Sequence, residues 1–218
     1  AAKNADPSIP TDIRWEGLRP VLEKGAPLFI RAQELEQMQS AVTWAADRGF
    51  KCVIVGGRDA EQCIDLLKKH DVAVMVTGAH RMPRRRDSAY DEPFTLPAIL
   101  EESGLRWCMA TAGGGFSTSA ERNLPYHIAT CVAYGLDPEV AIRSITLSAA
   151  EVLGVADRLG SIEPGKAATL IITDGNPLEI PTNVEVAFID GRRIDLSNKQ
   201  TDLNEKYLEK YRQLGVID

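Results

Sequence analysis

Four short, largely apolar runs alternate with amphipathic segments, and this alternation restricts the fold of the chain more than any other feature. The runs are Ala26–Ala32, Lys51–Val55, Val72–Thr77 and Leu105–Ala110. Strands that are apolar along their whole length are typical of parallel sheets, because helices cover both faces of such sheets. The pattern therefore predicts an α/β fold built around a parallel sheet.

Apolar residues recur at helical spacing after each run. The helices we expect are Gln33–Gly49, Asp59–His70, Leu96–Ser103, Asn123–Tyr134 and Pro138–Leu147, with a long polar loop at His80–Glu92. Four such βα units make half of an eight-fold barrel, or an open doubly wound sheet. Four parallel strands alone would leave exposed edges, which natural proteins avoid. We therefore expect further strands to complete the sheet.

The C-terminal part has a different pattern. We expect a strand at Thr169–Thr173, a hairpin of Val184–Ile189 and Arg192–Leu196 around the turn Asp190-Gly191, and a charged helix at Asp202–Leu214. Two or three strands do not form a stable sheet alone. The predicted organisation is an N-terminal arm or linker (1–12), half of a β/α barrel (13–158), strands of a β-sandwich lobe (159–200) and a C-terminal helix (201–218). A missing N-terminal half or a partner chain is expected to complete both barrel and lobe.

Composition limits the partners. The net charge of -6 and the pI near 5.2 argue against nucleic acid and anionic membranes, which need a positive field. No apolar run approaches the roughly 20 residues of a membrane helix, and the chain shows no targeting signal, so it reads as soluble with its compartment undetermined. The four cysteines are widely spaced and favour free, buried thiols, although a disulfide stays open as an alternative.

Several motifs occur in order near the C-terminal end. They are Asn123-Leu124-Pro125-Tyr126, the segment 141–154 (AIRSITLSAAEVLG), the segment 157–170 (DRLGSIEPGKAATL) and Gly175-Asn176-Pro177-Leu178. Together they resemble the end of an amidohydrolase-superfamily enzyme, closest to the imidazolonepropionase and prolidase-like branch. Thr169 stands where this family usually has Asp. The resemblance covers about Glu16 to Tyr211 and implies the second half of a TIM-like (β/α)8 barrel plus part of a small β-sandwich lobe.

The resemblance also implies a metal-dependent hydrolase acting on C–N bonds, in which the metal lowers the pKa of bound water and polarises the carbonyl. In the family, this half of the barrel normally supplies a His from strand five, a His from strand six and an Asp from strand eight. Those positions hold Arg31, Gly56 and Ala112 here. Arginine only donates hydrogen bonds, and glycine and alanine have no side-chain ligand atom. Zn or another divalent metal is therefore implied for the full protein, with none expected from this chain alone.

The side chains around the expected barrel mouth are basic. Arg31, Arg81, Gly113 and Gly114 are candidates for binding an anion, because arginine and exposed backbone N–H groups recognise carboxylate or phosphate. The alternative is that Arg84–Arg86 pair with Asp87, Asp91 and Glu92 on a solvated loop, and that the glycines only form a tight turn.

His80 is the one candidate catalytic side chain in this half, as a general base or ligand beside the arginines. The alternative for His80 is a surface hydrogen-bonding role. His127 is predicted to be structural, and no Ser/His pair is inferred from Ser117 or Ser119.

Two functional hypotheses remain. The first is the C-terminal portion of a hydrolase of cyclic-amide or peptide-like C–N bonds, which needs the N-terminal half for any metal site. The second is a catalytically degenerate half or subunit that completes a barrel and binds an anionic small molecule at the mouth. The sequence does not name a substrate, because specificity depends on loops grafted on the fold.

Overall fold

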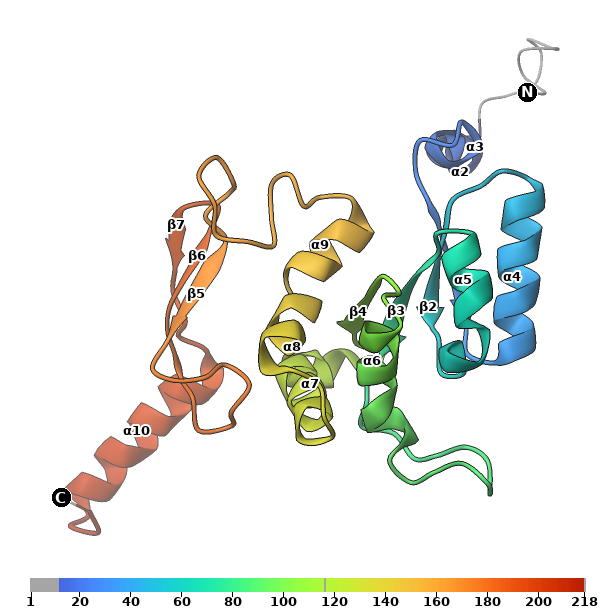
Figure 1. Cartoon of the computed structure of the whole chain (residues 1–218). Helices are drawn as coiled ribbons and strands as arrows, with labels where there is room; N and C mark the ends of the chain where they lie inside the picture. Colours follow the sequence, from blue (N-terminus) through green and yellow to red (C-terminus); the bar gives the residue numbers. More distant parts are fainter. Residues whose placement is uncertain (1–11, 116, 218) are drawn as a thin grey trace. The chain divides into compact units, whose positions relative to one another are not determined.

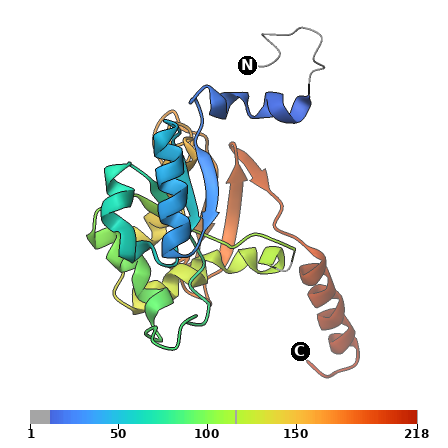
Figure 2. The ribbon, with the colours of Figure 1, turned by 90° about the vertical axis from the view of Figure 1, so that its right-hand side faces the viewer.

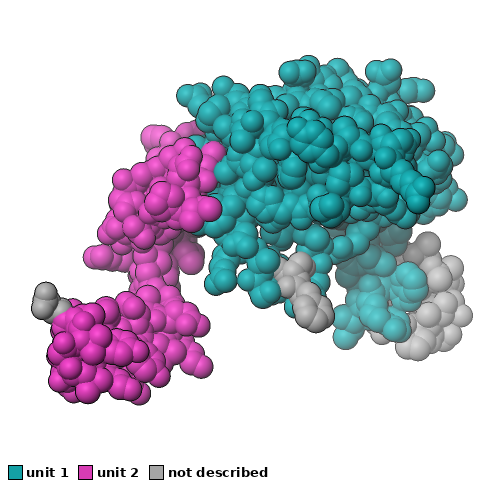
Figure 3. All heavy atoms as spheres, turned by 90° about the horizontal axis from the view of Figure 1, so that it is seen from below, with its two compact units in different colours: residues 1–161 teal, residues 162–218 magenta. Residues whose placement is uncertain are grey.

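The computed structural model describes residues 12–115 and 117–217, without the side chain of Ser117. The predicted N-terminal arm therefore lies almost wholly outside the described residues. The chain forms two compact units, residues 1–161 and 162–218, shown in teal and magenta in Figure 3. Each unit is described by itself.

The first unit is built on a four-stranded parallel sheet. Its strands are β1 (Leu28–Ala32), β2 (Cys52–Gly56), β3 (Ala73–Thr77) and β4 (Trp107–Ala110), paired in that order. Ala32 lies opposite Gly56, and Thr77 lies opposite Ala110, so the carboxyl ends of all four strands meet at one edge. The predicted α/β fold is confirmed, and the sheet is open within the described residues.

Helices lie along the sheet after each strand (Figures 1 and 2). They are α4 (Leu35–Asp47), the 3-10 turn η1 (Ala60–Cys63) leading into α5 (Ile64–Lys69), and α6 (Glu92–Glu102). Helix α4 buries Met38, Val42 and Ala45, the apolar positions whose helical spacing predicted it. Two short helices that the sequence pattern did not indicate, α2 (Ile13–Gly17) and α3 (Arg19–Leu22), precede β1 and bury no residue.

The two faces of the sheet differ in burial. Ile54, Val74 and Met109 are almost completely buried. On the alternate face Val53, Ala73 and Cys108 are also buried, whereas Phe29 is 45% exposed and Met75 is half-buried. The expectation that both faces are covered therefore holds only in part within the described residues.

After β4 in this unit, the 3-10 helix η2 (Ser117–Asn123) leads into α7 (Leu124–Ala133), and α8 (Pro138–Ser144) and α9 (Leu147–Leu153) come next. Asp137 caps α8 by accepting hydrogen bonds from the N–H groups of Glu139 and Val140. The helix predicted at Pro138–Leu147 is α8, which ends three residues earlier at Ser144. Thr146, with φ -125° and ψ -94°, lies outside the helical region, and α9 begins after it. Val152 of α9 packs against Val53, Ala73 and Cys108 of the sheet.

The second unit contains an antiparallel sheet of β5 (Leu170–Thr173), β6 (Val184–Ile189) and β7 (Arg192–Ile194). Asp190 and Gly191 have φ values of 51° and 76°, the two positive values that an Asp-Gly hairpin turn requires. Helix α10 spans Lys199–Gln213 and begins earlier than predicted, because Asn198 accepts hydrogen bonds from the N–H groups of Gln200 and Thr201.

The four cysteines, Cys52, Cys63, Cys108 and Cys131, are free and buried. Burial raises the pKa of Cys108 and Cys131 to about 12, so these thiols stay protonated. Among the helices that the structure describes, none has both the length and the apolar character to cross a membrane.

Candidate functional site

Two of the three positions that carry metal ligands in the family are joined by a hydrogen bond. Arg31 lies near the end of β1, and its Nη1 donates to the carbonyl oxygen of Ala112, just after β4, at 3.1 Å. The same guanidinium lies beside Gly113, where an added Cβ would be 3.5 Å from Nη2. The guanidinium of Arg31 is therefore held by a hydrogen bond at the carboxyl ends of β1 and β4.

The third position, Gly56, has no room for a side chain. Its φ is +124°, and an added Cβ would lie 2.6 Å from Cδ of Gln33 and 2.7 Å from the carbonyl oxygen of Ala32. The Gln33 side chain fills this space and donates from Nε2 to Oγ1 of Thr77 at 3.3 Å. The backbone itself, and not only the residue type, excludes a histidine here.

These residues do not fit the metal that the family implies. Arginine cannot act as a ligand, and the other two positions offer no side-chain donor atom. Within residues 12–115 and 117–217, no group of three or more His, Cys, Asp or Glu side chains is placed to hold a metal ion. We therefore derive no step that passes through a metal.

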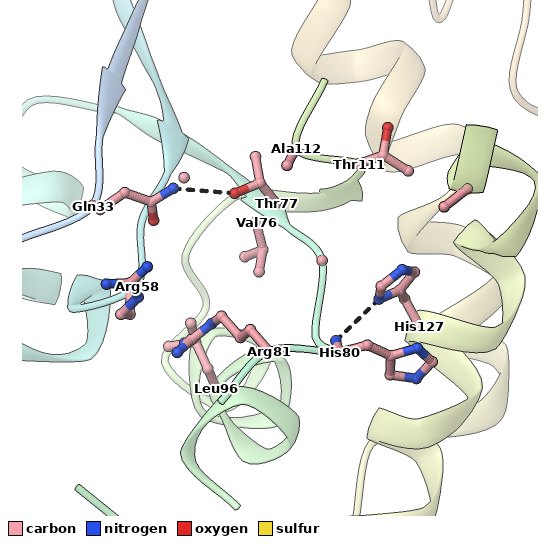
Figure 4. Close-up of a pocket in the computed structure, with 13 residues that line it drawn as sticks. Gln33, Arg58, Val76, Thr77, His80, Arg81, Leu96, Thr111, Ala112 and His127 are labelled. Atoms are coloured by element: carbon pink, nitrogen blue, oxygen red, sulfur yellow. Dashed lines mark hydrogen bonds between the residues drawn. The ribbon is translucent and has the colours of Figure 1, made fainter. Parts of the chain in front are cut away.

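A cavity of about 370 Å³ opens at the carboxyl ends of β2, β3 and β4 (Figure 4). It combines apolar walls with side chains that carry nitrogen and oxygen. The residues that line it are Gln33, Gly56, Arg58, Val76, Thr77, Gly78, His80, Arg81, Leu96, Thr111, Ala112, Ala120 and His127. Active sites of β/α barrels are found at this end of the strands.

Two histidines form one side of the cavity. The rings of His80 and His127 stack with their centroids 4.1 Å apart. Nδ1 of His127 accepts hydrogen bonds from the backbone N–H groups of Ala79 at 3.2 Å and His80 at 3.1 Å (Figure 4 shows the bond to His80). Burial lowers the pKa of His127, and the nearby His80 lowers it further. His127 is thus neutral at pH 7 and fixes the backbone after β3, the structural role predicted for it.

The hydrogen bonds of His80 assign its tautomer. Its Nε2 lies 2.8 Å from Oγ1 of Thr130, and that hydroxyl donates its own proton to the carbonyl oxygen of Tyr126 at 3.0 Å. Nε2 of neutral His80 is therefore the donor, and Nδ1 is the acceptor nitrogen of the ring. A proton acceptor at Nδ1 is what a general base in this cavity would require.

Arg58 and Arg81 form the other side of the cavity (Figure 4). Nη2 of Arg81 donates to Oε1 of Glu92 at 3.1 Å, and both side chains are mostly buried. Burial lowers the pKa of Arg81, while Glu92 acts in the opposite direction. Nη1 of Arg81 and Nε of Arg58 are buried and have no hydrogen-bond partner among the described residues.

Arg84 and Arg85 of the loop after β3 form ion pairs, but not with the acids of the loop itself. Arg84 pairs with Glu34, and Arg85 pairs with Asp59 at 2.7 Å. The expectation of pairing with Asp87, Asp91 and Glu92 is therefore wrong for these two arginines. The fold brings the loop over residues that follow β1 and β2, so acids distant in sequence become its partners.

Asp59, the partner of Arg85, is buried, with 3% of its surface exposed. Besides Arg85, its carboxylate accepts a hydrogen bond from the backbone N–H of Leu35 at 3.2 Å. Burial raises the pKa of Asp59, but the hydrogen bonds and the positive charges of Arg85 and Arg58 outweigh it, so the pKa lies below its usual value.

The structure brings together only part of the candidate set. His80 and Arg81 line the cavity, whereas Arg31, Gly113 and Gly114 lie outside its described lining. The carbonyl oxygen of Gly114 accepts hydrogen bonds from the backbone N–H and the hydroxyl of Thr118.

Sequence reasoning missed four polar residues of the cavity: Gln33, Arg58, Thr77 and Thr111. Each lies at or within two residues of the carboxyl end of a strand, and this position could have identified them as candidate site residues.

Parallel βα units with a cavity at the carboxyl ends of the strands place the chain in the α/β class that contains β/α barrels and open doubly wound sheets. Within that class, the sequence profile of the Amidohydrolase family matches residues 28–194, so the chain belongs to the amidohydrolase family. The predicted superfamily and its imidazolonepropionase and prolidase-like branch are confirmed.

Individual relatives agree with this assignment. Imidazolonepropionase of Pseudomonas aeruginosa is 27% identical over 155 residues, which cover 70% of this chain and 36% of the relative. The crystal structure of an amidohydrolase from Thermotoga maritima matches with a TM-score of 0.74 and 26% identity, over 89% of this chain and 50% of that one.

A Xaa-Pro dipeptidase crystallised with methionine in its active site shares the fold, with a TM-score of 0.62 and 21% identity, over 82% of this chain and 47% of that one. The chain thus spans about half the length of these structures, in agreement with the predicted half barrel.

Proposed function

We propose that this chain is the C-terminal portion of an amidohydrolase-type hydrolase that acts on cyclic-amide or peptide-like C–N bonds. The observation that carries the proposal is the polar cavity at the carboxyl ends of β2, β3 and β4. Family membership supports hydrolysis as the reaction class. Any metal ligands would come from an N-terminal half or a partner chain, which would also complete the barrel and the lobe.

The residues of this chain have defined roles in that reaction. Gln33 and Thr77 would orient a polar group of the substrate above the strand ends. His80 would take a proton at Nδ1, because its Nε2 is engaged with Thr130. Arg58 and Arg81 would bind negative charge on the opposite side of the cavity.

The test uses the intact protein, meaning this chain with any further portion it naturally carries. We expect stoichiometric Zn, Fe or Mn by elemental analysis and hydrolysis of at least one member of a panel of cyclic amides and dipeptides. His80→Gln should lower kcat about 100-fold or more, because a general base contributes that much. A metal-free protein that hydrolyses no member of the panel would contradict the proposal.

A second candidate is a catalytically degenerate half that binds an anion at the mouth. Two observations favour it: Arg31 is fixed on Ala112 where metal ligands are usual, and Gly56 cannot accept a side chain. Crystals of the intact protein soaked in phosphate or a dicarboxylate should then show density near Arg31 or Gly114. Metal content separates the candidates, because the degenerate protein would bind none.

A further inference from the structure

His80 is held by three contacts, and all three come from two side chains of helix α7. The backbone N–H of His80 donates to Nδ1 of His127 at 3.1 Å, and the two rings stack with their centroids 4.1 Å apart. Nε2 of His80 lies 2.8 Å from Oγ1 of Thr130. His127 and Thr130 are three residues apart in α7, a spacing that places two side chains on the same face of a helix.

The two side chains of α7 constrain His80 in different ways. His127 acts on the backbone, because its Nδ1 also accepts from the N–H of Ala79 at 3.2 Å, and on the face of the His80 ring. Neither contact decides which ring nitrogen of His80 carries the proton. Thr130 contacts a ring nitrogen directly, so its hydroxyl bears on the tautomer and on the rotation of the ring.

The hydroxyl of Thr130 has one proton and two contacts to satisfy. Its second contact is the carbonyl oxygen of Tyr126, one helical turn earlier, at 3.0 Å. A carbonyl oxygen can only accept, so the threonine proton is used there and the hydroxyl oxygen accepts from His80. With the His80 proton on Nδ1 instead, the hydroxyl would lose one of its two contacts. Only the Nε2–H tautomer of neutral His80 satisfies both.

We propose that Thr130 is a positioning residue for His80, whose hydroxyl holds the ring proton on Nε2 and so keeps Nδ1 as the proton acceptor. This deepens the proposed function and rests on its use of His80 as a general base. Thr130 lies outside the described lining of the cavity and acts only through His80. Both partners of the contact belong to this chain, so no residue of an N-terminal half is needed to form it.

The test compares Thr130→Val and Thr130→Ser in the intact protein. Valine keeps the branched shape but has no hydroxyl, whereas serine keeps the hydroxyl. The nitrogen chemical shifts of histidine-labelled protein report the tautomer, and a His80→Gln sample assigns the signals of His80. We expect Thr130→Val to raise the ratio of Nδ1–H to Nε2–H about fivefold, the effect of one lost hydrogen bond, and Thr130→Ser to restore it.

The kinetic readout separates positioning from binding. Thr130→Val should lower kcat at least about tenfold, because the base loses both its tautomer and its fixed orientation, while KM changes less than about twofold. Thr130→Ser should return kcat close to the wild-type value. Thr130→Ala, which suits a helix, gives a second variant without the hydroxyl in case valine unfolds the protein.

Thr95→Val is the matched control. The hydroxyl of Thr95 is bonded in the same way to the carbonyl oxygen of Asp91 in α6 at 3.3 Å, and like Thr130 it is half-buried. This variant should leave the His80 tautomer and kcat unchanged. An unchanged tautomer ratio in both Thr130→Val and Thr130→Ala, or an equal shift in Thr95→Val, would overturn the inference. If the tautomer shifts as expected in a protein that fails the hydrolysis panel, the positioning of His80 stands and only the proposed function is refuted.

Discussion

Gly56 decides whether the metal site of the family could be restored in this chain by substitution. Arg31 and Ala112 differ from the family pattern only by residue type. Gly56 differs also by conformation, because its backbone has φ +124° and the Gln33 side chain occupies the space above it. Placing the family residues back at these three positions would therefore not rebuild a metal centre.

Gly56→Ala is expected to destabilise the intact protein by about 1–3 kcal/mol more than Gly135→Ala. Gly135 is the matched control, since its φ is also strongly positive at +104° but nothing lies within 4 Å of an added Cβ. The difference between the variants isolates the steric clash from the backbone strain. Urea unfolding measures it, and equal losses would show that Gln33 moves aside without cost.

Asp59 makes stability depend on acid pH. Its pKa is lowered in the folded state, so its contribution is present above the unfolded pKa of about 4 and is lost as the pH falls through the folded value. We expect Asp59→Asn to cost about 1–3 kcal/mol at pH 7, because the hydrogen bonds from Arg85 lose their charged acceptor. Unfolding at pH 7 and at pH 3 measures the effect, and the gap between the proteins should narrow at pH 3.

At the scale of elements, the segment between β3 and α6 is held by pairs that bridge different βα units. Arg84 and Arg85 attach it to Glu34 after β1 and to Asp59 after β2. Three lining residues of the cavity, Gly78, His80 and Arg81, belong to this segment. Its position therefore depends on contacts that the polar composition of the loop did not specify.

Arg84→Ala/Arg85→Ala should accelerate chymotrypsin cleavage after Tyr90 about tenfold, because loss of both pairs frees the segment to open locally. Tyr90 is already 74% exposed, so access is limited by backbone opening and not by burial of the side chain. Arg86→Ala is the control and should cleave at the wild-type rate. Mass spectrometry of timed digests provides the measurement, and an unchanged rate in the double variant would mean that the pairs do not hold the segment.

The helices after the sheet show the limit of periodicity. The apolar pattern runs through Pro138–Leu147 without a strong break, yet the backbone of Thr146 interrupts it and a new helix begins at Leu147. The N-cap of α8 at Asp137 could be predicted from the sequence, because Asp before Pro-Glu is a local N-cap signal. The break between α8 and α9 was not predicted, and Gly160, which is distant in sequence, lies against Leu147 and Ala150 of α9.

At the scale of the whole molecule, one face of the first unit's sheet is exposed at β1, whereas α9 covers the same face at β2, β3 and β4. Phe29 of β1 is 45% exposed, and the sheet is open at β1 and β4 in the described residues. The proposed N-terminal half or partner chain would cover this face and pair with both edge strands.

Phe29→Ala is expected to destabilise the intact protein by about 3 kcal/mol or more, the cost of removing a buried aromatic ring. Tyr90→Ala is the control, and a truly exposed aromatic residue should change stability by no more than about 0.5 kcal/mol. Chemical unfolding of the two variants compares them directly. Similar small effects would mean that Phe29 stays in water in the intact protein.

The sequence by itself determined the alternation of strands and helices, the Asp190-Gly191 hairpin, the family and the three vacant ligand positions. These follow from local patterns: periodicity, turn chemistry and motifs in order. Only the tertiary structure decided the partners of the basic loop, the hydrogen bonds of His80, the closed space at Gly56 and the placement of Arg58 and Arg81 around one cavity. Each of these depends on contacts between residues distant in sequence, and their distances are set by packing of the whole sheet and not by any local pattern.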